Sequence, residues 1–248
     1  MRLSSKGNEM TIGLFGRGRL GSAIAREAGK DVLWQIGRQG EPQANVDVVI
    51  HASSPEGLES DLKWAVQHKI PMVIGTTGWS LPQLSTLVSS QIGVVVAPNF
   101  SMAVALFARL ATVLGKFASL DPQRDLYLME HHHAAKQDAP SGTAKMLIEQ
   151  LLKSCPRKTD WKIGGPVKPE ELSVAVLRAG PTCSSHTIGV DHPSEVIEFQ
   201  HVARSSSVFA TGALEAARWV QGKKGVYQFS DVVAPILDSI FQAESRKS

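Results

Sequence analysis

Short apolar runs alternate with helix-like segments along the first hundred residues of the chain. The runs have the pattern of buried strands, and the segments between them carry apolar residues at helical spacing. This pattern predicts strands at 11–15, 32–36, 46–52, 71–75 and 92–98 and helices at 19–29, 56–68 and 81–90. Such alternation favours an α/β fold with a parallel sheet and right-handed crossovers.

The pattern changes after Asn99, and we expect a domain boundary near residues 99–101. The later segments predict helices at 101–118, 141–153, 206–221 and 231–243, a strand at 125–131, and three strands of an antiparallel meander at 172–179, 184–190 and 195–202. In the third of these strands apolar and polar residues alternate, which predicts that one face of the strand is solvated.

Composition narrows the function classes. The chain has 248 residues, of which 43% are hydrophobic and 20% charged, so it is globular with enough apolar material for a sizeable core. A net charge of +3, from 26 basic and 23 acidic residues, gives no case for a nucleic-acid or membrane partner. Cys155 and Cys183 lack CxxC spacing and the N-terminus lacks a secretory pattern, so we expect a cytoplasmic protein.

A glycine-rich turn follows the first predicted strand and opens the first helix. Its spacing is Gly16-x-Gly18-x-x-Gly21. Gly16 permits a tight turn, Gly18 lets a pyrophosphate approach the backbone, and Gly21 allows the helix to pack closely on the sheet. The sequence therefore predicts a dinucleotide-binding site. The alternative is a glycine turn that binds no ligand, which the same spacing would allow.

The end of the second predicted strand bears on the choice of cofactor. A site selective for NAD often has Asp or Glu there, whereas this chain has Arg38. A guanidinium group could pair with the 2′-phosphate of NADPH. We expect NADPH, with NADH possible, and a solvated surface arginine as the alternative.

The segment EHHHAAKQDAPSGTAK (130–145) is unlike ordinary structure, and three interpretations compete for it. Adjacent histidines suggest a metal site, but neighbours on a strand face opposite ways and no HExxH is present, so we expect no metal. A solvated polar loop is the second interpretation. The third is an anion site, in which Ser141 and Thr143 cap a helix, Lys136 supplies a charge and a proton, and a histidine of near-neutral pKa assists.

The residues Glu130-x-His132-His133-x-x-Lys136-x-Asp138-Ala-Pro-Ser141-Gly142-Thr143 resemble the signature of the dihydrodipicolinate reductase family of lysine and diaminopimelate biosynthesis. Further similar segments are spread over most of the chain. They are Gly75-Thr76-Thr77-Gly78, Ala97-Pro-Asn99-Phe100-Ser101, Arg178-x-Gly180, His186-Thr187, Phe209-Ala210-x-Gly212 and Gly225-x-Tyr227.

The resemblance implies a Rossmann-like nucleotide domain at 1–100, joined by helices at 212–248, and a mixed α/β substrate and tetramerisation domain at 101–211. It implies NAD(P)H-dependent reduction of dihydrodipicolinate, a small cyclic dicarboxylate, by a homotetramer. His132 and Lys136 would be catalytic, and His133, Lys136, Ser141, Gly142 and Thr143 would bind the substrate. The implied cofactor-binding residues are Gly16, Gly18, Arg19, Leu20, Gly21, Arg38, Ser53, Gly75, Thr76, Thr77, Ala97, Asn99 and Phe100.

This chain departs from the family pattern at several places. The glycine turn is one residue shorter than usual, and the usual Asp-Phe after the third strand is His51-Ala52. The loop at 178–187 and the segment before Phe209 also differ. Two alternatives to the family activity therefore stay open, namely an imine reductase for another small dicarboxylate and a non-catalytic nucleotide-sensing homologue.

Overall fold

The structure is a computed structural model that describes residues 10–37, 39–79, 81–88 and 91–241. Its backbone divides into two compact units. One comprises the chain up to Ser101 together with the part that resumes at Ser206, and the other is Met102–Ser205. Each unit has its own sheet and its own apolar core, so the two are described separately below.

The first unit is built on a six-stranded sheet with the order β11-β5-β4-β3-β1-β2. All its neighbouring strands are parallel, as the strand–helix alternation predicts. Its strands are β1 (Ile12–Phe15), β2 (Val32–Ile36), β3 (Val48–His51), β4 (Met72–Ile74), β5 (Gly93–Val96) and β11 (Gly225–Gln228). The strand β11 was not predicted, because a run of four residues with two glycines nearby carries little pattern.

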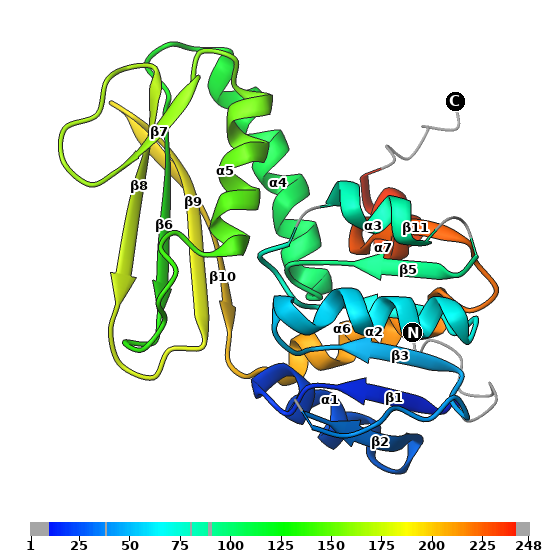
Figure 1. The fold of residues 1–248 in the computed structure, drawn as a ribbon. Helices are drawn as coiled ribbons and strands as arrows, with labels where there is room; N and C mark the ends of the chain where they lie inside the picture. The colour runs from blue at the N-terminus through cyan, green and yellow to red at the C-terminus, as the bar shows by residue number, and fades with distance from the viewer. Residues whose placement is uncertain (1–9, 38, 80, 89–90, 242–248) are drawn as a thin grey trace, which may run out of the picture. The chain divides into compact units, whose positions relative to one another are not determined.

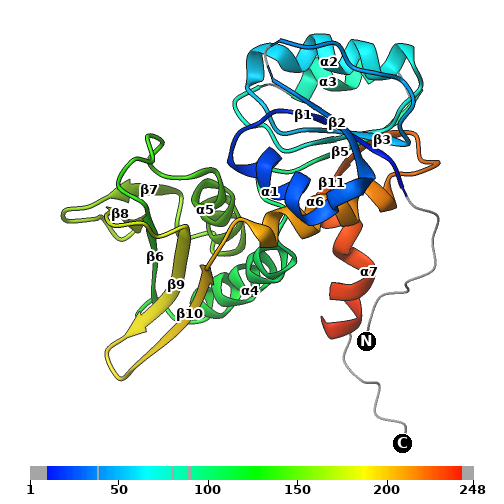
Figure 2. The same cartoon turned by 90° about the horizontal axis from the view of Figure 1, so that it is seen from below.

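Helices cover both faces of this sheet, which makes it a doubly wound, Rossmann-like fold. In Figure 2, α2 and α3 lie on one face and α1 and α6 on the other. The helices of the unit are α1 (Arg19–Ala28), the short 3₁₀ turn η1 (Gly29–Asp31), α2 (Pro55–Gln67), α3 (Leu81–Val88), α6 (Ser207–Trp219) and α7 (Phe229–Phe241). The strands β1, β3 and β5 are buried along their whole length, because parallel strands covered on both faces exclude water.

The second unit is built on a five-stranded mixed sheet with the order β10-β9-β6-β8-β7. Its elements are α4 (Met102–Ser119), β6 (Asp125–His132), α5 (Gly142–Ser154), β7 (Asp160–Ile163), β8 (Glu171–Arg178), β9 (Ser184–His192) and β10 (Glu195–Ala203). The prediction of a three-stranded meander is wrong. β9 and β10 form an antiparallel hairpin, but β8 pairs in parallel with β6, and β6 lies between β8 and β9.

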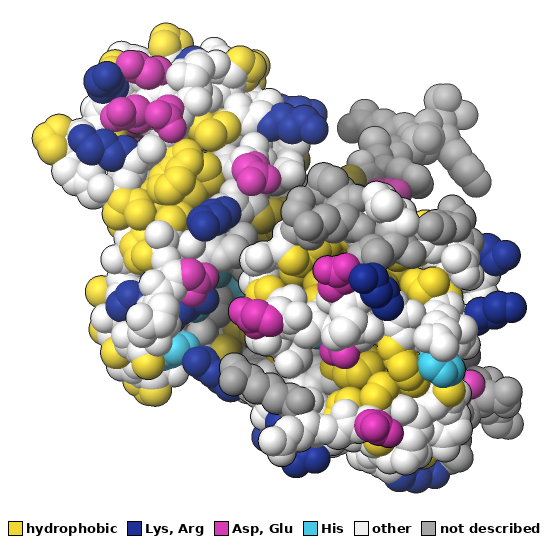
Figure 3. All heavy atoms as spheres, in the orientation of Figure 1, with side chains coloured by type: hydrophobic (Ala, Val, Ile, Leu, Met, Phe, Trp, Pro, Cys, Tyr) yellow, Lys and Arg dark blue, Asp and Glu magenta, His cyan; other side chains and the backbone are white. Residues whose placement is uncertain are grey.

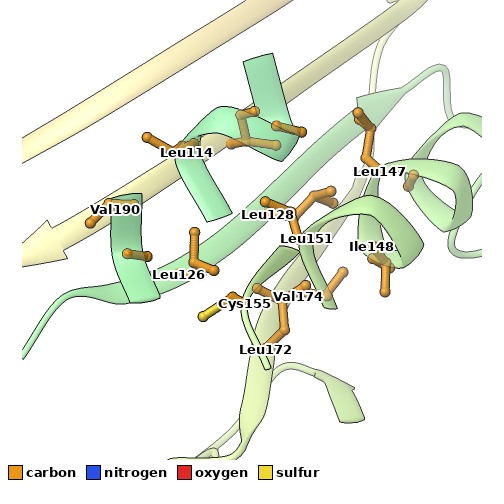
Figure 4. Packing of buried hydrophobic residues seen from close by; sticks show 14 of the residues in the cluster. Leu114, Leu126, Leu128, Leu147, Ile148, Leu151, Cys155, Leu172, Val174 and Val190 are labelled. Carbon is orange, nitrogen blue, oxygen red and sulfur yellow. The ribbon is translucent and has the colours of Figure 1, made fainter. Parts of the chain in front are cut away.

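The core of the second unit lies between its sheet and the helices α4 and α5 (Figure 1). Alternate residues of the strands point into it, so that Leu126 and Leu128 of β6 meet Leu147 and Leu151 of α5 (Figure 4). On β10 the predicted alternation is confirmed, since Phe199 packs against this core while its neighbours along the strand are exposed.

Helix α4 is long and apolar enough to cross a membrane by length and composition alone, with a mean hydropathy of 1.4. Its side chains Phe107, Ala111, Leu114 and Ala118 pack in the core of the second unit instead, as those of a core helix do. On the face shown in Figure 3, acidic and basic side chains are interspersed, and that face has no extended basic stripe of the kind that binds nucleic acid.

Candidate active site

The glycine turn after β1 is shaped by backbone contacts that leave no room for a side chain at two of its three glycines. Gly16 has φ of 115°, and a Cβ there would lie 2.2 Å from the carbonyl oxygen of Ala52. A Cβ on Gly21 would lie 2.3 Å from the carbonyl oxygen of Gly16, whereas one on Gly18 would meet nothing within 4 Å. The turn is therefore closed at Gly16 and Gly21 and open at Gly18, the place where a pyrophosphate approaches the backbone at the start of a helix.

The turn lies where the strand order reverses. In the sheet, β2 lies on one side of β1 and β3 lies on the other side. Proteins of the α/β class bind ligands at such a point, in the crevice outside the carboxyl ends of the strands. A Cβ on Gly75 would lie 2.7 Å from Leu20 and 3.2 Å from Phe100, so three of the predicted cofactor residues meet there. Ser53 joins the same edge because its carbonyl oxygen accepts a hydrogen bond from the Thr76 hydroxyl at 2.9 Å.

The positions of the other predicted cofactor residues are given by their exposure and by their place at the ends of the strands and helices. Arg19 is exposed at the start of α1, and Thr77 is exposed beyond β4. Ala97 is buried beyond β5, and the side chain of Asn99 accepts a hydrogen bond from the backbone of Ser101 at 2.8 Å. Arg38 lies outside the described residues.

A second arginine, Arg17, lies in the glycine turn after β1 and was not predicted as a site residue. Its side chain reaches the end of β2, where the guanidinium group donates to the carbonyl oxygen of Gln35 at 2.9 Å and the side chain passes close to Gly37. The signal for it was its place between Gly16 and Gly18 in the predicted phosphate turn.

A buried carboxylate organises the second candidate region, in the second unit. The side chain of Glu130 on β6 is fully buried. It accepts a hydrogen bond from Arg178 at 2.6 Å and from the backbone N–H of Ser141, with both carboxylate oxygens at 3.1 Å. Burial alone would raise the pKa of Glu130, but hydrogen bonds from His186, Ser141 and Arg178 outweigh it and hold this pKa well below its usual range.

Sheet register brings these partners together. Glu130 lies opposite His186 across the β6–β9 pair, and His132 lies opposite Arg178 across the β6–β8 pair. The Arg178 guanidinium also donates to the carbonyl oxygen of Asp138 at 2.6 Å, so it ties the loop after β6 to the sheet. Glu130, Arg178 and His186 belong to the quoted motifs, but sequence reasoning gave them no role.

The two buried histidines of this region, His132 and His186, meet edge to face, with ring centroids 5.2 Å apart and an angle of 75° between the ring planes. Burial and the neighbouring His186 lower the pKa of His132 to about 4, so its ring is neutral near pH 7. The expectation of a near-neutral histidine pKa is therefore wrong for His132. Its Nδ1 lies 3.7 Å from Glu130 and has no hydrogen-bond partner within the described part of the chain.

The loop after β6 presents the lysine. Lys136 Nζ pairs with Asp138 Oδ1 at 2.7 Å, and this hydrogen bond lowers the pKa of Asp138 although burial acts against it. Ser141 then caps α5, since its hydroxyl oxygen accepts from the N–H of Ala144 at 3.1 Å. The cap predicted at Ser141 is confirmed. Gly142 and Thr143 lie in the first turn of the helix, the end at which the helix dipole favours anions.

The side chains Glu130, His132 and His186 could also offer one ligand atom each to a metal ion, since these atoms all lie within 4.8 Å of one another. Two of them come from β6 and one from β9, so residues far apart in the sequence form this group. The guanidinium group of Arg178 already neutralises the carboxylate at 2.6 Å, which favours the hydrogen-bonded cluster over a cation site.

Comparison with known proteins settles the family. Residues 102–233 match the family described as "Dihydrodipicolinate reductase, C-terminus", and residues 36–100 match "Dihydrodipicolinate reductase, N-terminus". The chain belongs to the dihydrodipicolinate reductase family. The N-terminal match begins only at residue 36, so the shortened glycine turn lies outside the matched part of this reductase.

Relatives of this dihydrodipicolinate reductase family extend over most of the chain. A 4-hydroxy-tetrahydrodipicolinate reductase of Alkaliphilus oremlandii is 31% identical, covering 90% of this chain and 98% of its own. One of Rhodopseudomonas palustris is 37% identical, covering 81% of this chain and 75% of its own. The solved structure of a dipicolinate-bound dihydrodipicolinate reductase from Paenisporosarcina sp. TG-14 has the same fold, with a TM-score of 0.69 at 18% identity, covering 88% and 97% of the two chains.

Proposed function

We propose that this protein catalyses the NAD(P)H-dependent reduction of dihydrodipicolinate, formed from 4-hydroxy-tetrahydrodipicolinate, to tetrahydrodipicolinate in lysine and diaminopimelate biosynthesis. The family membership supports the reaction. The observation that carries it is the arrangement of a lysine, a neutral histidine and a capped helix end on one loop and strand of the second unit. A small dicarboxylate is the ligand that suits those groups.

Lys136 is the proposed acid. A nicotinamide cofactor, when bound, would supply hydride for ring carbon C4 of the substrate, and the balancing negative charge would develop at C3 and the ring nitrogen. An ammonium group at this place offsets the charge and donates the balancing proton. In the free protein its partner is Asp138, which a substrate carboxylate would replace in part.

His132 is proposed as an assisting group rather than as the acid, because a pKa of about 4 leaves it uncharged near neutral pH. A neutral ring can still donate one hydrogen bond and accept another. His133, Ser141, Gly142 and Thr143 are proposed to bind the carboxylates, through side chains and through the N–H groups at the start of α5.

NADPH is the proposed cofactor, with NADH possible. Arg17 supports this choice, because its guanidinium group reaches the end of β2, and a guanidinium group there suits a 2′-phosphate. Arg17→Ala should weaken NADPH binding more than NADH binding, as measured by calorimetry. Arg26→Ala, an exposed arginine of the same helix region, is the matched control and should change neither affinity. Equal losses for both nucleotides in Arg17→Ala would remove Arg17 from phosphate recognition.

A homotetramer formed through the second sheet is also proposed. The sheet face opposite α4 and α5 exposes large apolar side chains on three strands, namely Met129, Leu177, Val196 and Val202. Val196→Glu should dissociate the assembly in sedimentation experiments, whereas Leu120→Glu, at an exposed site beyond α4, should not. A wild-type protein that sediments as a monomer at micromolar concentration would contradict this assembly.

The activity is tested by following NADPH absorbance with freshly made 4-hydroxy-tetrahydrodipicolinate. Lys136→Ala should lower kcat by roughly 10²–10⁴-fold if Lys136 is the acid. Lys145→Ala, an exposed lysine of α5, is the control and should leave kcat unchanged. Turnover by Lys136→Ala at the wild-type kcat with only a raised KM would make Lys136 a binding charge. Absence of NADPH oxidation by the wild type at any pH would refute the proposed reaction.

A further inference from the structure

A buried histidine that the family pattern lacks holds together the loops at the nucleotide crevice. His51 is the last residue of β3, and its side chain is fully buried. Its Nδ1 lies 2.7 Å from the hydroxyl oxygen of Thr76, and its Nε2 lies 3.3 Å from Oδ2 of Asp61 on α2. The imidazole therefore lies between helix α2 and the segment that follows β4, and its hydrogen bond is to the latter.

The Thr76 hydroxyl group has two partners within hydrogen-bond distance. They are the carbonyl oxygen of Ser53 at 2.9 Å and Nδ1 of His51 at 2.7 Å. A hydroxyl group can donate or accept, so the bond to the imidazole forms with either tautomer of the ring. A phenylalanine or leucine at position 51 would remove this partner from the buried Thr76 hydroxyl group.

Two further contacts show how tightly the segment is held. The backbone N–H of Gly75 donates to the carbonyl oxygen of His51 at 2.9 Å, and the indole of Trp79 donates to the carbonyl oxygen of Thr76 at 2.7 Å. The imidazole and the indole are the side chains of this set. The backbone carbonyl oxygen of His51 lies 3.6 Å from the place of a Cβ on Gly75, the residue at which Leu20 and Phe100 meet.

We infer that His51 is a positioning residue of the nucleotide site, which fixes segment 75–77 for the cofactor through its hydrogen bond with Thr76. This inference rests on the proposed use of a nicotinamide dinucleotide. His51 itself does not touch the cofactor in this scheme, and it acts through Thr76 alone. The consequence is an effect on nucleotide affinity, with kcat at saturating cofactor unchanged.

The test measures the Kd of NADPH and of NADH by calorimetry, without dicarboxylate, for the wild type and four variants. The variants are His51→Phe, His51→Asn, Thr76→Val and His51→Phe/Thr76→Val. His51→Phe should raise both Kd values about 3- to 10-fold, the effect of one buried hydrogen bond. His51→Asn should return to within about twofold of the wild type, because its amide offers both a donor and an acceptor near the place of Nδ1. The double variant should be no weaker than the weaker single variant, since both changes remove the same bond.

Each outcome decides the matter. His51→Phe with wild-type Kd values and a wild-type thermal transition would overturn the inference. His51→Asn with affinities as weak as those of His51→Phe would also overturn it, because the shape of the ring and not its hydrogen bond would then matter. If His51→Phe does not fold, His51→Leu makes the same comparison with less volume. A wild type that binds neither nucleotide would overturn the proposed function as well, which separates the two failures.

Discussion

Replacing Arg178 by leucine tests the claim that its guanidinium group compensates a buried charge. The side chain of Glu130 is fully buried, whereas 17% of the Arg178 side chain is exposed, and their charged atoms are 2.6 Å apart. Arg178→Leu removes the cation and leaves the carboxylate with hydrogen bonds from Ser141 and a contact with His186. It also removes the bond from Arg178 to the carbonyl oxygen of Asp138.

The expected loss is large. Removing one partner of a buried ion pair costs about 3–5 kcal/mol of unfolding free energy. The hydrogen bonds that Glu130 keeps place this case at the lower end, about 3 kcal/mol. For a chain of this length, each kcal/mol of lost unfolding free energy lowers Tm by about 2–4 °C. Arg178→Leu should therefore melt about 6–12 °C below the wild type.

Thermal unfolding followed by circular dichroism measures this shift. The double variant Glu130→Gln/Arg178→Leu is the informative companion, because the amide keeps an acceptor for Ser141 but carries no charge. It should recover about half of the lost Tm. Arg218→Leu is the control. It breaks an exposed ion pair with Glu215, 3.1 Å long, and should shift Tm by no more than about 3 °C.

Two results would refute the reasoning. Arg178→Leu could melt within about 3 °C of the wild type, in which case the carboxylate does not need the guanidinium group. Alternatively, the double variant could melt as low as Arg178→Leu, in which case the loss comes from the arginine's packing and its bond to the loop, not from a stranded charge on Glu130.

Three further predictions concern the caps, the turn and the pH dependence. Ser141→Ala should lower the unfolding free energy by about 1 kcal/mol in urea titrations, because α5 loses its cap. Gly16→Ala should strongly destabilise the protein, since its Cβ would lie 2.2 Å from a backbone oxygen, whereas Gly18→Ala should fold normally and weaken nucleotide binding in calorimetry. Burial lowers the pKa of His132 from 6.5 to about 4, so as the pH falls the unfolded chain takes up this proton before the folded protein does. The unfolding free energy should therefore be greatest above pH 6.5 and should decrease by up to about 3 kcal/mol between pH 6.5 and 4. His132→Asn should remove that dependence in urea titrations in a His201→Asn background, because burial lowers the pKa of His201 in the same direction.

The local sequence pattern was enough to predict many of the strands, helices and turns of this protein. The run 32–36 was predicted as a strand and is β2 to the residue, because a short apolar run between polar segments has few other stable states. The glycine turn and the cap at Ser141 were also readable, since each depends on the backbone geometry of a few consecutive residues. The sequence by itself therefore determined the α/β class, the turn that opens α1, and the segment that carries the lysine.

Only the tertiary structure decided which strands pair and which charges are buried together. The meander was predicted because β8, β9 and β10 follow one another, yet β6 separates β8 from β9. That insertion brings His186 and Arg178 to Glu130, and the resulting burial makes His132 neutral. Strand partners, and the desolvation that shifts a pKa, depend on residues far apart in the chain, so no short stretch of sequence contains them.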